Sequence, residues 1–179
     1  MKKYELTEET VTVYGKTLYR IRAVRDFGSV KTGEFGGYIE KEENLSHFGN
    51  AWVSGNAWVF DNARVFGNAW VSGNAWVFDN AWVCGDAKVY GDAWVSGNAE
   101  VFNTRHFFVQ GPIGSRNGFI TFYRTKDNTV EVRCGCFSGS LQKFVDRVEE
   151  THGGSRYEKE YKLAAELAKV CIRLEGESR

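Results

Sequence analysis

The sequence predicts a mainly β protein with a left-handed parallel β-helix at its centre. Three observations predict this fold class. Alanine and valine recur every six residues through the middle of the chain, and a block of 18 residues is repeated almost unchanged. A Gly-Asn, Asp-Asn or Gly-Asp pair also precedes each repeated alanine. The flanking segments add an N-terminal β-hairpin and a small C-terminal ββαα unit.

The repeat consists of nine consecutive units of the form Gly/Asp–Asn/Asp–Ala–x–Val–x. Alanine and valine lie two residues apart, so in a strand both point to one face, which we expect to be the interior. The preceding pair favours a turn, because glycine and asparagine adopt positive φ at little cost. The repeated residues are Ala51, Ala57, Ala63, Ala69, Ala75, Ala81, Ala87, Ala93 and Ala99, with Val53, Val59, Val65, Val71, Val77, Val83, Val89, Val95 and Val101.

The 18-residue block predicts coils with three sides. Residues 49–66 and 67–84 differ only at two positions, and residues 85–102 are a looser third copy. Three coils stacked at about 4.8 Å make a rod about 15 Å long. Residues 43–48 fit a degenerate unit with Leu45 at the alanine position and His47 at the valine position. Residues 37–42 fit another, with Ile39 pointing inward.

The six tryptophans all lie between a repeated alanine and valine, where we expect them to face outward. The 18-residue period assigns Trp52, Trp70 and Lys88 to one side, and Arg64, Trp82 and Glu100 to another. The remaining side carries a group that we call the aromatic plate: Trp58, Phe60, Trp76, Phe78 and Trp94. An exposed apolar patch of this size predicts an interface, and we expect a homotrimer. The alternative is a stacking platform for sugars or nucleobases.

The chain divides into three predicted parts. Residues 1–42 contain a β-hairpin at 10–24 and a glycine-rich capping segment, and residues 43–103 form the β-helix. Residues 104–179 form the ββαα unit. Its strands are expected at 119–125 and 129–137. Its helices are expected at 140–153 and 155–174, from the spacing of their apolar residues.

Composition excludes several classes of protein. Lys and Arg together number 23, as do Asp and Glu, so the net charge of zero gives duplex nucleic-acid binding no support. No apolar run is long enough for a membrane helix, and the first residues do not resemble a signal peptide. The four cysteines do not form a disulfide framework. We therefore expect a cytoplasmic protein that does not bind membranes.

Few residues suggest catalysis or metal binding. His47 and His106 flank the regular coils, and His152 ends a predicted helix, where histidine is a common cap. Cys134 and Cys136 lack a second Cys or His pair at a zinc-ligand spacing, so we expect no metal site.

One constellation suggests anion binding. Ser115 and Arg116 lie in a glycine-rich loop, and Ser138 and Ser140 precede a predicted helix whose N-terminus would attract anions. Arg124 and Arg133, on the intervening strands, could add charge-assisted hydrogen bonds to phosphate. In the alternative interpretation, a serine is an ordinary helix cap and the arginines are solvated.

The repeat GNAWVSGNAWVF resembles the hexapeptide-repeat superfamily of left-handed β-helices. That resemblance implies a trimer and, for many members, acyl transfer from coenzyme A or acyl carrier protein. The leader GGYIEKEENLS and the tail SRNGFITFYRTKD, CGCFSGSLQKF and THG resemble uncharacterised hexapeptide proteins of phages and mobile elements, which are labelled polymer-forming or acetyltransferase-like.

The resemblance leaves three functions open. Superfamily acyltransferases carry a catalytic histidine on the coil and a loop that bulges from it, whereas residues 49–102 contain neither a histidine nor an insertion. His47 and His106 are the candidates for that role, with coenzyme A as the cofactor. We favour a non-catalytic ligand-binding homotrimer without a cofactor, in its most specific form a phage sponge that sequesters a nucleotide immune signal in the host cytoplasm. A structural or protein-interaction scaffold is the third possibility.

Overall fold

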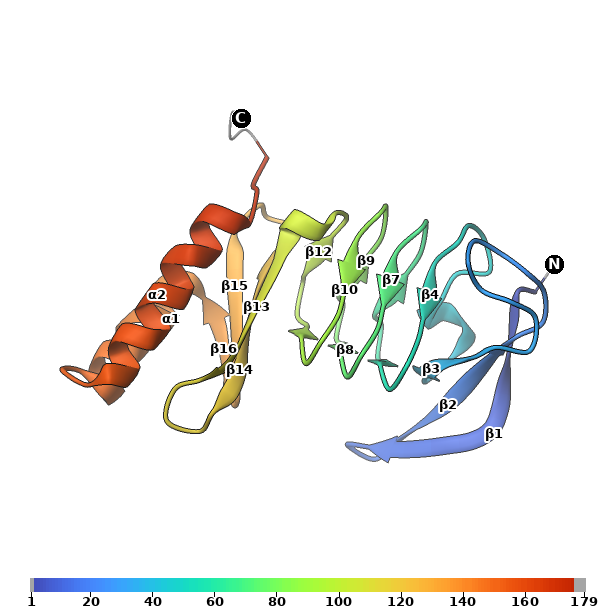
Figure 1. Ribbon diagram of the computed structural model, residues 1–179, viewed down its shortest axis with the longest axis horizontal. Helices are drawn as coiled ribbons and strands as arrows, with labels where there is room; N and C mark the ends of the chain where they lie inside the picture. The colour runs from blue at the N-terminus through green and yellow to red at the C-terminus, as the bar shows by residue number, and fades with distance from the viewer. Residues whose placement is uncertain (1, 176–179) are drawn as a thin grey trace.

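The computed structural model describes residues 2–175 and shows a row of stacked coils with a folded cap at each end (Figure 1). The N-terminal cap contains β1 (Tyr4–Val13), β2 (Lys16–Ala23), β3 (Phe35–Ile39) and the short helix η1 (Glu42–Asn44). The coils contain β4 (Trp52–Val53), β5 (Trp58–Val59), β6 (Arg64–Val65), β7 (Trp70–Val71), β8 (Trp76–Val77), β9 (Trp82–Val83), β10 (Lys88–Val89), β11 (Trp94–Val95) and β12 (Glu100–Val101). The C-terminal cap contains η2 (Thr104–His106), β13 (Phe107–Ile113), β14 (Gly118–Arg124), β15 (Val130–Cys134), β16 (Phe137–Ser140), α1 (Leu141–His152) and α2 (Arg156–Cys171).

The coils stack as three parallel sheets. The strand β3 pairs with β5, β8 and β11 on one side, β4, β7 and β10 form the second side, and β6, β9 and β12 form the third. Within the regular coils each strand residue pairs with the residue 18 positions later, as Trp52 does with Trp70. The repeated alanines and valines are all buried. The predicted parallel β-helix and its three sides are confirmed.

The corners require left-handed backbone at the first residue of each Gly/Asp–Asn/Asp pair, where φ lies between +57° and +71°. Corners of successive coils lie in close contact. A Cβ atom on Gly49 would lie 2.4 Å from the carbonyl oxygen of Gly67. The second residue of the pair forms side-chain ladders along the rod, in which Asn50 donates to Asn68 at 3.2 Å and Asn68 donates to Asp86 at 3.0 Å.

The first turn is wider than the others. Ile39 is buried, as expected, and pairs with Val59. Leu45 forms a parallel bridge with Val65, so it occupies the valine register. The prediction that Leu45 takes the alanine position and His47 the valine position is wrong, because this turn contains two extra residues before Trp52.

The β1–β2 hairpin curls along one side of the rod (Figure 1). The hairpin residues Val13 and Leu18 form a buried cluster with Phe60 and Phe78, so these two phenylalanines of the aromatic plate are covered within the chain. We expected Trp52 to face solvent, but it does not. Tyr4 and Phe27 pack against it and bury it completely. The buried ammonium of Lys3 donates to the Ala51 carbonyl at 2.6 Å and closes this end of the solenoid.

The C-terminal sheet has four antiparallel strands in sequence order, two more than predicted. Its strand β14 has two buried faces. Thr121 and Tyr123 face the last coil, where the Trp94 backbone N–H donates to the Thr121 hydroxyl at 3.0 Å. Ile120 and Phe122 join the helices α1 and α2 in a second core. Helices and sheet are thereby fixed to the end of the solenoid.

We expect a methyl group at Gly49 to destabilise the protein more than one at Gly91. Both residues have φ near +70°, so Gly→Ala costs about 1 kcal/mol of backbone strain at either position. Only at Gly49 does the new Cβ meet the next coil, whereas nothing lies within 4 Å of it at Gly91. Urea unfolding of Gly49→Ala and Gly91→Ala measures the difference, and equal losses would show that the corner contact does not limit the stack.

Candidate functional site

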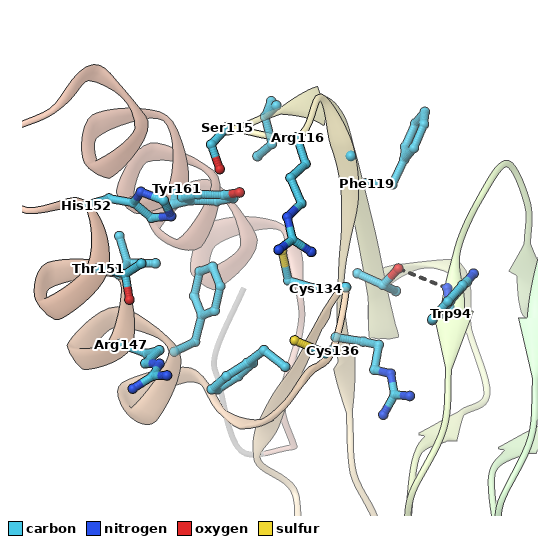
Figure 2. A pocket seen from close by; sticks show the side chains of 18 of the residues that line it. Trp94, Ser115, Arg116, Phe119, Cys134, Cys136, Arg147, Thr151, His152 and Tyr161 are labelled. Atoms are coloured by element: carbon cyan, nitrogen blue, oxygen red, sulfur yellow. Dashed lines mark hydrogen bonds between the residues drawn. The ribbon is translucent and has the colours of Figure 1, made fainter.

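A cleft of about 800 Å³ lies between the C-terminal sheet, its two helices and the last coil. Its walls come from the β13–β14 hairpin, the β15–β16 turn, α1, α2 and β11. Figure 2 shows Ser115, Arg116 and Cys134 on one side of this space and Thr151, His152 and Tyr161 on the helices opposite. The volume lies in the range typical of small-molecule sites.

The charged lining of the cleft is mainly basic. Arg116, Arg133 and Arg147 line it, with Asp92 as the one acidic lining residue. The guanidinium of Arg133 lies over the rings of Phe78 and Trp94, with centroid distances of 5.3 Å and 5.8 Å. Its Nε is buried and has no hydrogen-bond partner in the described residues. Stacking thus holds Arg133 in place while its hydrogen-bonding capacity is only partly used.

The position of the Ser115–Arg116 loop is fixed by α2. The Gly114 N–H donates to Oε2 of Glu160 at 2.7 Å. Gly114 has φ of +72°, and a Cβ there would lie 1.9 Å from the Tyr161 hydroxyl oxygen. Glycine is required here by both backbone conformation and space. This close approach presents Ser115 and Arg116, both exposed, at the mouth of the cleft.

The cleft also contains a tyrosine and two thiols. Burial raises the pKa of Tyr161, and the neighbouring Cys134 raises it further. Burial also raises the pKa of the Cys134 thiol. Tyr161 and Cys134 are therefore neutral near pH 7 and contribute hydrogen bonds without negative charge. Cys136 is exposed in the β15–β16 turn.

Three of the predicted anion-site residues do not line the cleft. Arg124 is buried at the far end of β14, where it pairs with Glu100 at 3.4 Å and Glu175 at 3.0 Å and lies over the Phe102 ring. Ser140 is the N-cap of α1 and accepts from the Lys143 N–H. Ser138 is exposed on β16, opposite Arg133 in the strand register. The cleft is lined by α1 from Phe144 onward, so the first turn of the helix and its N-cap are not part of it.

His47 and His106 also lie outside the cleft. His47 stacks on the Tyr4 ring at 4.3 Å, accepts from the Lys3 N–H, and has its pKa lowered mainly by burial. His106 is 4% exposed and lies with its Nε2 2.8 Å from the Asn103 side-chain nitrogen. Burial, with the charge of Arg124, lowers its pKa to about 4. Both histidines are packed as structural residues in this arrangement.

The aromatic plate consists of two stacked columns. The Trp58, Trp76 and Trp94 rings stack at 4.5 Å and 4.8 Å, and the Phe60 and Phe78 rings stack at 5.1 Å. The tryptophans are half-buried. Because the indole faces between coils are occupied by each other, the plate offers mainly ring edges to an outside ligand. Trp94, the last in its column, also lines the cleft.

The comparison with known families agrees with this architecture. A family model described as the YdcK beta solenoid repeat matches residues 59–73. A search of curated proteins gave no match. The match and the stacked parallel coils support a beta-solenoid repeat protein.

None of the helices within residues 2–175 has the length and apolarity to cross a membrane. That part of the chain also has no group of three or more His, Cys, Asp or Glu side chains placed to hold a metal ion.

Sequence reasoning found Ser115, Arg116 and Arg133 but missed the residues that the helices contribute. Arg147 and Thr151 lie four positions apart on α1, as do Val148 and His152. This spacing puts each pair on one face of the helix, which could have indicated a lining surface. Tyr161, on α2, is a third lining residue that the sequence did not indicate.

We expect stability to fall between pH 6.5 and pH 5 because His106 resists protonation in the folded state. Its folded pKa of about 4 lies below the unfolded value, so its contribution is complete above pH 6.5 and is lost as the pH falls. For one such group, the free energy of unfolding falls by about 1.4 kcal/mol per pH unit. Chemical unfolding of wild type and His106→Gln across this range isolates the effect, and identical slopes would contradict it.

Proposed function

We propose that the protein is a non-catalytic ligand-binding protein that captures an anionic, ring-bearing small molecule in the cleft. The observation that carries this proposal is the basic lining of the cleft, to which Arg116, Arg133 and Arg147 contribute, with Asp92 as the one acidic lining residue among residues 2–175. Guanidinium groups bind phosphate or carboxylate through charge-assisted, bidentate hydrogen bonds. In a partly enclosed cleft the effective dielectric constant is lower than in bulk water, which strengthens such bonds.

The rest of the lining suits an aromatic ring. Phe119, Phe137, Phe144 and Tyr161 line the same cleft as the arginines, together with Trp94. Stacking on aromatic side chains contributes about 1–3 kcal/mol per nucleobase in nucleic-acid-binding proteins. A ligand with phosphate at one end and a base at the other would use both kinds of lining. The proposal therefore favours a nucleotide-derived molecule.

In its most specific form, the protein is a sponge of the phage type that sequesters a nucleotide immune signal. Such a role needs tight binding without turnover. The cleft supports this form because the ligand would meet arginines, aromatic rings and neutral hydroxyl or thiol groups. The arginines and rings on which this proposal rests belong to the same chain, so the proposal holds with or without the expected homotrimer.

Acyl transfer from coenzyme A is the alternative enzymatic function. It needs a histidine that substrate can reach and that acts as a general base. His106 is buried beside Phe102 and Asn103, and His47 is packed between the N-terminal strand and the first turn. A purely structural scaffold, the other alternative, would leave the arginine-lined cleft without a role.

The decisive experiment is native mass spectrometry of the protein purified gently from cells, followed by heat denaturation and analysis of what is released. An intact nucleotide-like molecule would support capture without turnover. A processed product would indicate an enzyme. If no molecule is bound and none of a panel of mono-, di- and cyclic nucleotides binds in calorimetry, the proposal is wrong.

We expect Arg116→Ala to weaken binding of the best nucleotide in that panel. Loss of a hydrogen bond to a charged group costs about 1.5–3 kcal/mol, which corresponds to roughly a 10- to 150-fold loss of affinity. Arg105→Ala is the matched control, because Arg105 is exposed on η2 and does not line the cleft. Calorimetric titration of both variants gives the comparison, and equal affinities would place the ligand elsewhere.

A further inference from the structure

The third side of the solenoid carries two outward columns of side chains that we call the open face. One column is Arg64, Trp82 and Glu100, and the other is Phe66, Cys84 and Phe102. The hairpin covers Phe60 and Phe78 on one of the other sides and Phe27 covers Trp52 on the second, whereas Trp82 is 43% exposed, the most of any tryptophan. The Trp82 ring meets Phe66 edge-to-face at 5.9 Å, so the apolar surface is continuous between coils.

The register of the sheet fixes the spacing within each column. Arg64 pairs with Trp82, and Trp82 pairs with Glu100, in successive parallel strands. Their Cα atoms are therefore one strand spacing apart, about 4.8 Å. Residues two positions further along each strand project on the same side, which places Phe66, Cys84 and Phe102 in a parallel column.

This pattern is its own complement when one copy is turned end over end. Rotation by 180° about an axis parallel to β9 exchanges the first and third coils and keeps each column opposite itself. Arg64 then faces Glu100 of the second copy, and Trp82 faces Trp82. In the other column Phe66 faces Phe102, and Cys84 faces Cys84. Each dimer would contain two Arg–Glu pairs around a central tryptophan pair.

The charges at the two ends of the column are available for these pairs. Arg64 is exposed, and its guanidinium has no ion-pair partner among residues 2–175. The Glu100 side chain contacts the buried Arg124 at 3.4 Å and is 34% exposed. Arg124 thus holds the carboxylate in place while part of it still faces solvent. If the two solenoids instead packed parallel, the twofold rotation would exchange the two columns. Arg64 would then face Phe66 of the second copy, and no ion pair would form.

We propose that the open face is a self-association surface at which two copies pack antiparallel, with Arg64 of each paired to Glu100 of the other and Trp82 at the twofold axis. The occupant is a second copy of this chain because the two columns match their own inverted order in both charge and apolar character. Closed twofold contacts are isologous, so this interface ends at the dimer and does not extend into a filament. The proposal does not depend on ligand capture in the cleft.

The test is sedimentation analysis of the full chain over a concentration series. We expect wild type to reach twice the mass of the 20.3 kDa chain. Arg64→Glu should raise the dimer dissociation constant by about tenfold, because both ion pairs become repulsive. Lys88→Glu is the matched control, since Lys88 is exposed at the equivalent position of another side. It should leave the dimer intact, and added salt should weaken the wild-type dimer.

A second variant distinguishes loss of the interface from loss of folding. Trp82→Lys places two ammonium groups opposite each other at the axis and should give monomers, with the circular dichroism spectrum unchanged. A monomeric wild type overturns the proposal, as does a dimer dissociation constant that Arg64→Glu leaves unchanged. A trimer that Trp76→Glu breaks and Arg64→Glu does not would assign association to the aromatic plate. Nucleotide affinity in Arg64→Glu should equal that of wild type, which separates this test from that of the cleft.

Discussion

The close stacking of identical corners is the constraint on which the rest of the structure depends. Each coil bonds to the next through backbone N–H and C=O groups 17 residues apart, such as Trp70 N–H to Ala87 O at 2.9 Å. Corners such as Gly49 leave no room for a Cβ atom between coils. An insertion within a regular coil would move every later side chain out of its column. The indole and asparagine ladders exist only because this spacing is kept.

A solenoid of this kind has two open ends, and the two ends are closed differently. At the first end, the wider turn, Lys3 and Tyr4 satisfy carbonyl groups that have no earlier coil to pair with. At the last end, Thr121 and Tyr123 of β14 cover the coil, and the Trp94 N–H finds its acceptor there. The second cap brings a sheet and two helices with it, and the cleft forms where these helices diverge from the sheet.

The cleft therefore arises from capping, whereas the open face arises from the repeat. Their chemistry differs accordingly. The cleft combines arginines from separate elements, of which Arg133 is held by stacking on the last rings of two solenoid columns. On the open face, the same column position holds Arg64 in the first coil, Trp82 in the second and Glu100 in the third. Opposite charges therefore lie at the two ends of the column, with an aromatic ring between them. The proposed ligand of the cleft is a small anion with a ring, and the proposed partner of the open face is a second copy of the chain.

The sequence by itself determined the parallel solenoid, its three sides and the face on which each tryptophan lies, because each six-residue unit encodes its own strand, corner and interior residues. It also indicated Ser115, Arg116 and Arg133 as candidates for anion binding. Only the tertiary structure decided that Trp52, Phe60 and Phe78 are covered, that Arg124 is buried in ion pairs, and that Arg147, Thr151 and Tyr161 complete the cleft. Those outcomes depend on which distant segments pack on which side of the rod, and no local pattern specifies that packing.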